Sequence, residues 1–474
     1  MSLVIANNIA SLNAQHSLHR STIGLNRSLE RLSTGLKVNR GADNPAALVI
    51  SEKQRAQIAG LRKAIENTEK AISLVQTAEG ALNEINTLLV RIRSLALDSA
   101  NTGVNDDDAL AANQAEIDNS LETIDRIANN TQFGIKQLLD GSAGVSGITD
   151  TTDIIFHKGS GDTVAGVYEI EVTTPGRRAS VSAPILQTDP LAQSESITVN
   201  GVSISLSQGL QPNEVINRIN EFTSQTGVTA DDGGAGGELR LYSTSFGTEA
   251  DIRVTSNQLA AADSTGLGRT SLQATGQNVV GTINGDPFQG NGNLAVAQLG
   301  LANGVILSLQ PDSAGDITET VQGVVGNVTI EDRSLQFQVG PNRNQASTVS
   351  IGSVKTDTLG LGVGGNQFVN LREILVTSNE TANDTIAIVD AAIDDVTSMR
   401  GTLGAFQRNT LQSTSNNLRA TLENTVNAES VIRDTDFAEE VATFTKQQVL
   451  VQAGTSVLSN ANQMSQLVLS LLNG

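Results

Sequence analysis

Hydrophobic residues at the C-terminal end of the chain recur at a spacing of seven. Residues 447–474 also contain no charged side chain, although the whole chain is acidic. This heptad pattern predicts a helix that buries an apolar row, or seam, against other helices. The seam positions predicted at this end are Leu450, Val457, Ala461, Met464, Val468 and Leu471.

A second heptad pattern lies at the N-terminal end, where residues 1–43 have a basic bias. The opposite charges of the two ends favour pairing of the ends with each other. Surface ion pairs are worth under about 1 kcal/mol, so we expect the apolar rows to matter more. The seam positions predicted at this end are Ile5, Ile9, Leu12, Leu25, Leu29 and Leu32.

The C-terminal tail is expected to order fully only when several partners surround it. Burial of one side of a lone helix does not clearly offset the conformational entropy that the helix loses. Polar residues such as Gln452, Asn460 and Gln466 recur through the tail, which makes it too polar for a membrane span. The alternative is a buried C-terminal helix of one large globule.

Helical periodicity also predicts long rods between the two ends. Pro45 suits the first position of a helix, and from Ala46 to about Ala100 apolar rows repeat without another proline. At 1.5 Å per residue this helix would be roughly 80 Å long, which implies coiled-coil packing. A helix at about 106–129 is expected to fold back on it, and a helix at about 380–433 to pair with both.

Residues 141–330 have a different composition, rich in Gly, Ser, Thr, Asn and Val. They hold 19 Asp and Glu against 7 Lys and Arg, which is −12 of the net charge of −20. Asn200 and Gly201 fit a two-residue hairpin turn. Strands are predicted at 167–173, 196–199, 202–206, 238–242 and 252–255, a helix at 212–223, and a further hairpin at 334–339 and 347–354.

The sequence therefore predicts an α + β multidomain fold. Long coiled-coil-like helical hairpin rods from both chain ends would carry a β-rich inserted outer domain of one or two subdomains. The expected divisions are 1–43 (N-terminal helix), 44–140 (N-terminal rods), 141–330 (insert), 331–434 (β-hairpin plus C-terminal rod) and 435–474 (C-terminal helix).

Composition narrows the possible chemistry. Cysteine is absent, which removes thiol nucleophiles, disulfides and cysteine metal sites, and only three His occur. The acidic balance argues against nucleic acid and anionic lipid as main partners. The N-terminus lacks the features of a cleaved secretory signal peptide, and no run of 18 apolar residues occurs. Gly360, Gly362 and Gly365 fit G-x-G-x-x-G, but we interpret them as a loop. No catalytic residue, metal site or cofactor is predicted.

Motifs at the two ends resemble bacterial flagellin. They are LSTGLKVN at 32–39, ADNPAA at 42–47, TQFG at 131–134, IRDTDFA at 432–438 and AGTSVL at 453–458. The resemblance covers roughly 1–140 and 335–474. The insert resembles the family's variable outer domain, and its hairpin at 196–201 is similar to a module seen in flagellin inserts. The rival is the hook–filament junction (hook-associated) protein, which shares the terminal helices; the close terminal motifs and the long insert favour flagellin.

The resemblance implies a structural subunit, not an enzyme, that self-assembles through its terminal helices into the extracellular flagellar filament for motility. Residues 1–43 and 435–474 would form the inner tube, and 44–140 and 331–434 the outer tube. The subunit would leave through the flagellar export apparatus without a cleaved signal peptide. The implied partners are other copies of the chain, an export chaperone on the C-terminal helix, and the filament cap and hook-associated proteins.

The family also has a surface that binds the vertebrate Toll-like receptor for flagellin. Its pattern falls on Arg91, Leu95 and Glu116, while Ser94 departs from the acidic residue common there. Solvated helix surface or filament packing would equally explain these residues. A zinc-proteinase insert is excluded because His157 is the insert's only His. An adhesive or carbohydrate-binding role of the insert, and its O-glycosylation, remain open alternatives.

Overall fold

The computed structural model describes residues 8–101, 103–233, 236–312 and 316–472, with side chains at 107 and beyond 463 left out. The chain divides into two compact units. The first combines residues 1–69, 338–346 and 413–474, and the second combines 70–337 and 347–412. Each unit is therefore built from segments that are far apart in the sequence.

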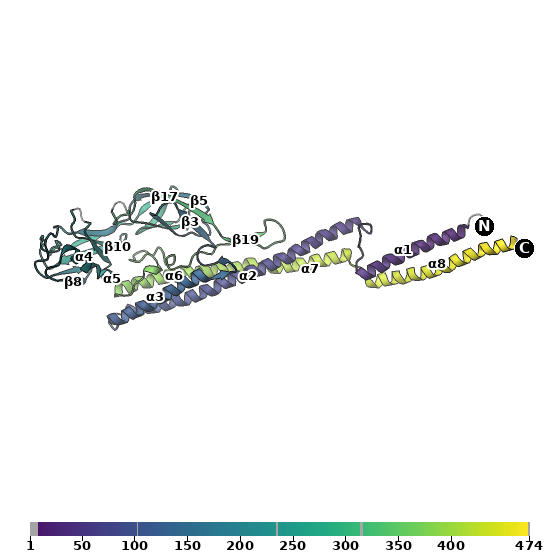
Figure 1. Cartoon of the computed structure of the whole chain (residues 1–474), viewed down its shortest axis with the longest axis horizontal. Helices are drawn as coiled ribbons and strands as arrows, with labels where there is room; N and C mark the ends of the chain where they lie inside the picture. The colour runs from purple at the N-terminus through teal and green to yellow at the C-terminus, as the bar shows by residue number, and fades with distance from the viewer. Residues whose placement is uncertain (1–7, 102, 234–235, 313–315, 473–474) are drawn as a thin grey trace. The chain divides into compact units, whose positions relative to one another are not determined.

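Two long antiparallel helices from the chain ends lie side by side in the first unit (Figure 1). Helix α1 (Ile9–Thr34) begins after Asn8, whose side chain accepts a hydrogen bond from the Ser11 amide. It ends at Gly35, which has φ 73° and donates its N–H to Arg31 O. A left-handed residue of this kind terminates a helix, and glycine adopts it without strain. Helix α8 (Phe437–Leu472) runs alongside.

Backbone hydrogen bonds join the segment that follows α1 to the segment that precedes α8. Lys37 donates its N–H to Arg433 O at 2.7 Å, and Thr435 donates to Gly35 O at 3.0 Å. The next turn ends at Asn44, whose side chain accepts from the Ala47 amide at 3.0 Å. Helix α2 (Pro45–Ser99, 55 residues) begins there, so the predicted long helix is confirmed.

The N-terminal part of α2 packs against α7 (Ser413–Arg433) in the first unit. Their contact is apolar in the middle and carries ion pairs at both ends. Arg433 reaches Glu52 at 2.8 Å, and Arg419 reaches Glu69 at 2.6 Å. The apolar residues are Leu61, Ala64, Ile65, Leu418 and Leu422.

In the second unit the rest of α2 lies with α3 (Asp107–Asn130) and α6 (Asn379–Ala405). Asp106 caps α3 by accepting from the Ala109 amide, so the predicted helix at 106–129 is confirmed. The expected helix at 380–433 is divided: a π-helical segment, η2 (Phe406–Gln412), separates α6 from α7. Fully buried apolar residues of this helical core are Leu82, Ile85, Leu89, Ile92, Ile117, Ile124, Ile388, Val389 and Val396.

Eight antiparallel strands form one β lobe of the second unit, here called the first β lobe. The sheet curls on itself, because Gly147 on one edge strand lies against Phe156 on the other. Its core includes Tyr168, Ile170, Val328 and Leu307. In sheet order the strands are β3 (Val145–Thr149), β17 (Gly323–Asp332), β5 (Gly166–Thr174), β13 (Val280–Ile283), β14 (Asp286–Asn291), β15 (Leu294–Ala297), β16 (Ile306–Leu309) and β4 (Ile154–Lys158).

Two smaller sheets and α4 form the second β lobe, which has its own core. Asn200 and Gly201 join two of its strands with φ of 48° and 85°, confirming the predicted two-residue turn. Its elements are β6 (Arg178–Ser182), β10 (Arg240–Phe246) and β9 (Val228–Asp231) in one sheet; β12 (Leu272–Thr275), β11 (Asp251–Ser256), β7 (Glu195–Val199) and β8 (Val202–Leu206) in the other; and the helices α4 (Pro212–Asn220) and α5 (Thr223–Thr226).

The remaining elements are short. They are β1 (Gln132–Phe133) with β2 (Lys136–Gln137), β18 (Leu335–Gln338) with β19 (Ala346–Val349), and the turn η1 (Leu371–Glu373). The prediction that the last strand reaches 354 is wrong. Ile351 and Val354 instead donate their N–H groups to Ala143 O and Leu139 O. Gly360, Gly362 and Gly365 lie in a loop with positive φ, as predicted.

These elements confirm the predicted fold class of helical rods carrying a β-rich insert.

Candidate assembly surface

Small side chains form the contact between α1 and α8. Ser11, Ala14 and Ser28 are the buried residues of α1. A Cβ added to Gly24 would lie 2.9 Å from Cδ of Gln447, and one added to Gly454 would lie 3.3 Å from Cδ1 of Leu18. Both glycines therefore allow the two helix backbones to approach closely.

Polar contacts also fix the register of this helix pair. Asn8 donates from Nδ2 to Ala461 O at 3.0 Å, and Ser11 donates from Oγ to Asn462 Oδ1 at 2.8 Å. At the other end Arg31 pairs with Glu440 at 3.4 Å, where Glu440 is only 8% exposed. Buried polar pairs of this kind specify register more than they add stability.

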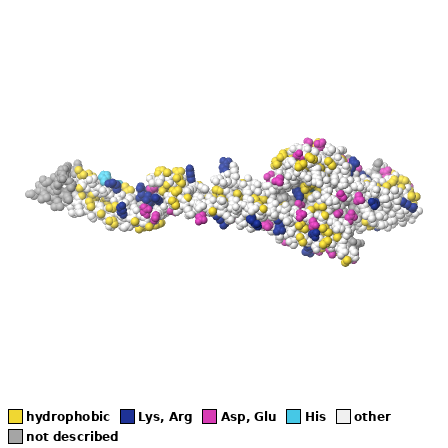
Figure 2. Space-filling view, turned by 180° about the vertical axis from the view of Figure 1, so that it is seen from behind, with side chains coloured by type: hydrophobic (Ala, Val, Ile, Leu, Met, Phe, Trp, Pro, Cys, Tyr) yellow, Lys and Arg dark blue, Asp and Glu magenta, His cyan; other side chains and the backbone are white. Residues whose placement is uncertain are grey.

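Eight larger apolar residues of the same two helices remain exposed although the helices pair with each other. Figure 2 shows apolar side chains along the surface of this helix pair. Between 44% and 60% of each side chain is exposed, which is unusual for so many aliphatic residues on one element pair. The residues are Ile9, Leu12, Ile23 and Leu29 on α1, with Val441, Val449, Leu450 and Val457 on α8. We call this set the outward apolar row.

The predicted seam is therefore divided between two faces. Ala461 lies at the α1–α8 contact, and Leu25 and Leu32 are half-buried. The remaining described positions belong to the outward apolar row and are exposed in the single chain, so their predicted role in assembly between copies stays a prediction: Ile9, Leu12, Leu29, Leu450 and Val457. Ile5 and the side chains of Met464, Val468 and Leu471 lie outside the described residues.

Sequence reasoning missed part of this contact. The row Ser11, Leu18, Leu25 also has a spacing of seven, but Ser11 is small and polar, so the row is less apolar than the predicted seam. The signal that could have found it is the pair Gly24 and Gly454, since glycine inside a helix has a packing reason more often than a conformational one.

The turn between α1 and α2 carries the clearest electrostatic feature of the first unit. The carboxylate of Asp43 accepts the backbone N–H groups of Arg40 and Asn39 at 3.0 and 3.2 Å. Arg27 lies 3.8 Å away. The hydrogen bond from the Arg40 N–H has the largest effect and lowers the pKa of Asp43; burial opposes it, and the Asn39 N–H with the positive charges of Arg27 and Arg31 keeps that pKa below its usual value.

The three receptor-contact candidates lie together in the second unit. Arg91 on α2 donates from Nε to Glu116 Oε1 on α3 at 2.6 Å, with the two side chains 64% and 41% exposed. Leu95 lies one helical turn after Arg91 and is half-buried. The two charges are therefore engaged with each other at the surface, which the sequence did not predict.

Within the residues that the structure describes, no helix is both long enough and apolar enough to cross a membrane. Within the same residues, no group of three or more His, Asp or Glu side chains comes together as a metal site would require.

Comparison with known proteins gives matches at both chain ends and over the full length. Residues 5–144 match the bacterial flagellin N-terminal helical region, and residues 386–472 match the bacterial flagellin C-terminal helical region. The chain is 33% identical over 508 residues to the B-type flagellin of Pseudomonas aeruginosa, covering 100% of both chains. It is 30% identical over 506 residues to a flagellin of Salmonella typhimurium, again covering 100% of both.

Among solved structures the chain is similar to the flagellar junction protein FlgL from Legionella pneumophila. That likeness has 15% identity, covers 81% of this chain and 99% of the other, and has a TM-score of 0.28. The assignment comes from the sequence matches.

The long terminal helices, the β-rich insert and these matches define a structural subunit of the bacterial flagellum. The chain belongs to the bacterial flagellin family, whose members are subunits of the flagellar filament.

Proposed function

We propose that this chain polymerises by burying its outward apolar row between neighbouring copies. The single observation that supports this proposal is that the aliphatic residues of α1 and α8 stay exposed although the two helices already pair with each other. Burying an aliphatic side chain fully contributes roughly 1.5–3 kcal/mol, so eight such residues can drive association of copies. The outward apolar row is then available to contact other subunits.

A matched pair of double variants tests this proposal. Leu450→Ser with Val457→Ser changes the outward apolar row, and Leu259→Ser with Leu299→Ser changes two exposed apolar residues of the β lobes. Because each residue is about half-exposed, losing roughly 1.5–3 kcal/mol per subunit should prevent assembly of the first variant at concentrations where the wild type polymerises, since about 1.4 kcal/mol is a tenfold change in affinity. Electron microscopy after seeded assembly should show filaments for the wild type and the control. Normal filaments from the first variant would refute the assignment.

The division of the chain into filament layers is part of the same proposal. Residues 1–43 and 435–474 would form the inner tube, 44–140 and 331–434 the outer tube, and 141–330 the outer surface. The −12 charge of the last segment supports a solvated position. Limited proteolysis of assembled filaments should cleave 141–330 first; early cleavage within 9–34 would contradict this order.

An export chaperone on α8 would cover the same exposed aliphatic residues before secretion. An uncovered apolar helix invites aggregation, which is the physical reason for such a partner. We expect the chain to co-elute with its cognate chaperone and a variant lacking 447–474 not to do so.

We further infer export through the flagellar apparatus with the N-terminus intact. Mass spectrometry of the N-terminal peptide from filaments should start at Met1 or Ser2. A start further into the chain would identify a cleaved leader.

Contacts with the filament cap and hook-associated proteins would also use the terminal helices. Chemical crosslinking at the filament ends tests these contacts.

Recognition by the vertebrate Toll-like receptor for flagellin would use Arg91, Leu95 and Glu116. The proximity of all three on α2 and α3 supports one continuous patch. Because Arg91 and Glu116 pair with each other, a receptor would have to exchange that ion pair for its own contacts. Monomers with Arg91→Ala or Leu95→Ala should signal more weakly in receptor-expressing cells than monomers with Arg126→Ala, an exposed α3 residue. Equal signalling by all three would reject the patch.

A further inference from the structure

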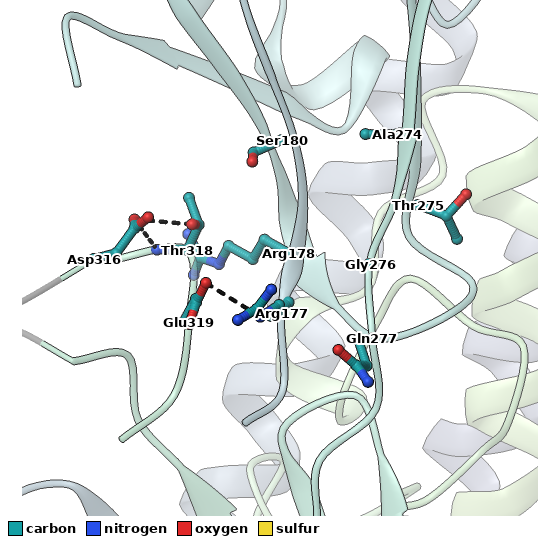
Figure 3. A pocket seen from close by; sticks show the side chains of 10 residues that line it. All are labelled: Arg177, Arg178, Ser180, Ala274, Thr275, Gly276, Gln277, Asp316, Thr318 and Glu319. Carbon is teal, nitrogen blue, oxygen red and sulfur yellow. Dashed lines mark hydrogen bonds and ion pairs between the residues drawn. The ribbon is translucent and has the colours of Figure 1, made fainter. Parts of the chain in front are cut away.

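A polar cavity of about 520 Å³ lies in the β-rich part of the second unit. It lies between the start of β6, the end of β12 and the segment at 316–319 (Figure 3). Figure 3 shows Arg177, Gln277 and Glu319 reaching into the opening from these segments, while Thr275 points away. Most of its lining is therefore able to donate or accept hydrogen bonds.

The carboxylates that line this cavity already have cationic or hydrogen-bonding partners. Glu319 pairs with Arg177 at 3.1 Å. Asp316 accepts from the Thr318 amide at 3.0 Å and from the Thr318 hydroxyl at 2.8 Å, and it also pairs with Arg240 at 3.0 Å. These contacts hold one wall of the cavity in place and leave its acidic groups neutralised.

Arg178 is the cation of the cavity without such a partner. Its guanidinium carbon lies 4.6 Å from the centre of the Phe246 ring and 5.5 Å from that of Tyr242. Among the described residues, its side chain makes no hydrogen bond or ion pair with another residue, and its Nε is buried. Burial lowers the pKa of Arg178, because desolvation disfavours the charged form. The two aromatic rings fix the plane of the Arg178 guanidinium group, and its N–H donors have no acceptor on another described residue.

The planar guanidinium of Arg178 and the polar side chains around it indicate which class of ligand the cavity would bind. A guanidinium binds a carboxylate through two parallel hydrogen bonds. The hydroxyl of Ser180 and the amide of Gln277 line the same cavity and suit the hydroxyl groups of a sugar. Because Glu319 and Asp316 are already paired with Arg177 and Arg240, Arg178 offers one unbalanced positive charge, which matches the single charge of a carboxylate better than the two charges of phosphate. We propose that this cavity binds a carboxylate-bearing sugar, such as a uronic acid residue of a polysaccharide.

Saturation-transfer NMR on the full-length chain tests this proposal with three ligands: a galacturonic acid disaccharide, its neutral methyl ester and inorganic phosphate. The acid should bind the wild type and the ester at least about tenfold more weakly, because the ester cannot accept a charge-assisted pair from Arg178. Phosphate should not displace the acid. Absence of binding at millimolar concentration, or equal binding of acid and ester, would overturn the proposal.

Variants locate the binding to Arg178. Arg178→Gln should weaken binding of the acid at least about tenfold. Arg218→Gln is the matched control: Arg218 also stacks on a ring, that of Phe222 at 4.9 Å, but it lies outside the cavity and pairs with Glu221. Unchanged binding by Arg178→Gln would reject the site. If that variant does not fold, Gln277→Ala provides the test, because it removes a proposed sugar contact at the rim. It must then weaken binding of the galacturonic acid disaccharide for the proposal to stand.

Discussion

Glu195, at the start of β7, is the most enclosed carboxylate that the structure describes with a full set of partners. It is 3% exposed and accepts from the hydroxyls of Ser256 and Thr265, both at 2.5 Å, and from the Thr265 amide at 2.9 Å. The carboxylate accepts from three buried donors, which an apolar residue at this position would leave without an acceptor. It ties two strands of the second β lobe to the loop at 264–266.

Replacing Glu195 by Ala should destabilise the second β lobe by about 1–3 kcal/mol, because the Thr265 amide is left buried without an acceptor. In a Tyr168→Phe background the only tyrosine is Tyr242 of this lobe, so its fluorescence during urea unfolding measures the effect. Glu221→Ala, which removes an exposed ion-pairing carboxylate, should change stability by under about 1 kcal/mol. Equal effects of the two substitutions would contradict this role.

His157 on β4 gives the first β lobe a pH-dependent stability. Burial lowers the pKa of His157, opposed by the nearby Asp357 and assisted by the charge of Lys158. The unfolded chain therefore binds a proton more readily than the folded one. The stability that the neutral His157 contributes is fully present above the usual histidine pKa and is lost as the pH falls below that value and through the lower folded pKa.

We expect the first β lobe to be less stable at about pH 5 than at about pH 7.5, and His157→Gln to reduce that difference. Thermal unfolding followed by Tyr168 in a Tyr242→Phe background measures it. His16→Gln, which changes an exposed histidine of α1, is the control and should leave the difference intact. A pH dependence that is the same with and without His157 would contradict the assignment.

At the scale of elements, the turn between α1 and α2 depends on Asp43. Its folded pKa is depressed, so the stability that it contributes is present above the usual aspartate pKa and is lost as the pH falls through the lower folded pKa. The turn connects two long helices. Hydrogen exchange of its backbone amides therefore measures directly whether the turn is formed.

Hydrogen exchange at Asn39 and Arg40 should therefore accelerate, beyond the intrinsic effect of pH, as the pH falls below about 4. In Asp43→Asn the same amides should exchange fast at neutral pH and show little further loss. Asp108→Asn, at an exposed position of α3, should behave as the wild type. Unchanged protection in Asp43→Asn would show that the carboxylate does not hold the turn.

The π-helical segment η2 explains why the predicted C-terminal rod changes face. Val396, Leu403, Leu411 and Leu418 are all buried, yet their spacings are seven, eight and seven. The π-helix takes up the extra residue in its wider turn, so burial continues along the chain. The irregular spacing was visible in the sequence, but an α-helix alone does not predict it.

At the scale of the whole molecule, assembly should depend on the tail more than on the insert. A chain lacking 447–474 loses most of α8, including Leu450 and Val457 of the outward apolar row. We expect it to remain a soluble monomer in sedimentation and electron microscopy. Removal of 141–330, replaced by a short Gly-Ser linker, is the control, because it removes more residues but leaves both terminal helices. Long filaments from the tail truncation would refute the role of the tail.

Much of this architecture follows from the sequence alone. The seven-residue spacing from Ala46 to Ala100, the capping residues Asn44 and Asp106, and the Asn200–Gly201 turn each act within a few residues, so they determine local structure without tertiary help. The terminal motifs were likewise sufficient to identify the flagellin family.

Only the tertiary structure decided which heptad row of each terminal helix faces its partner. Both rows satisfy the same periodicity, so the period gives no preference between them. The α1–α8 pair uses the row with Gly24 and Gly454 because small residues allow the closest approach of the backbones, and this choice leaves Leu450 and Val457 outside. The Arg91–Glu116 pair and the unpartnered Arg178 likewise depend on segments that only folding brings together.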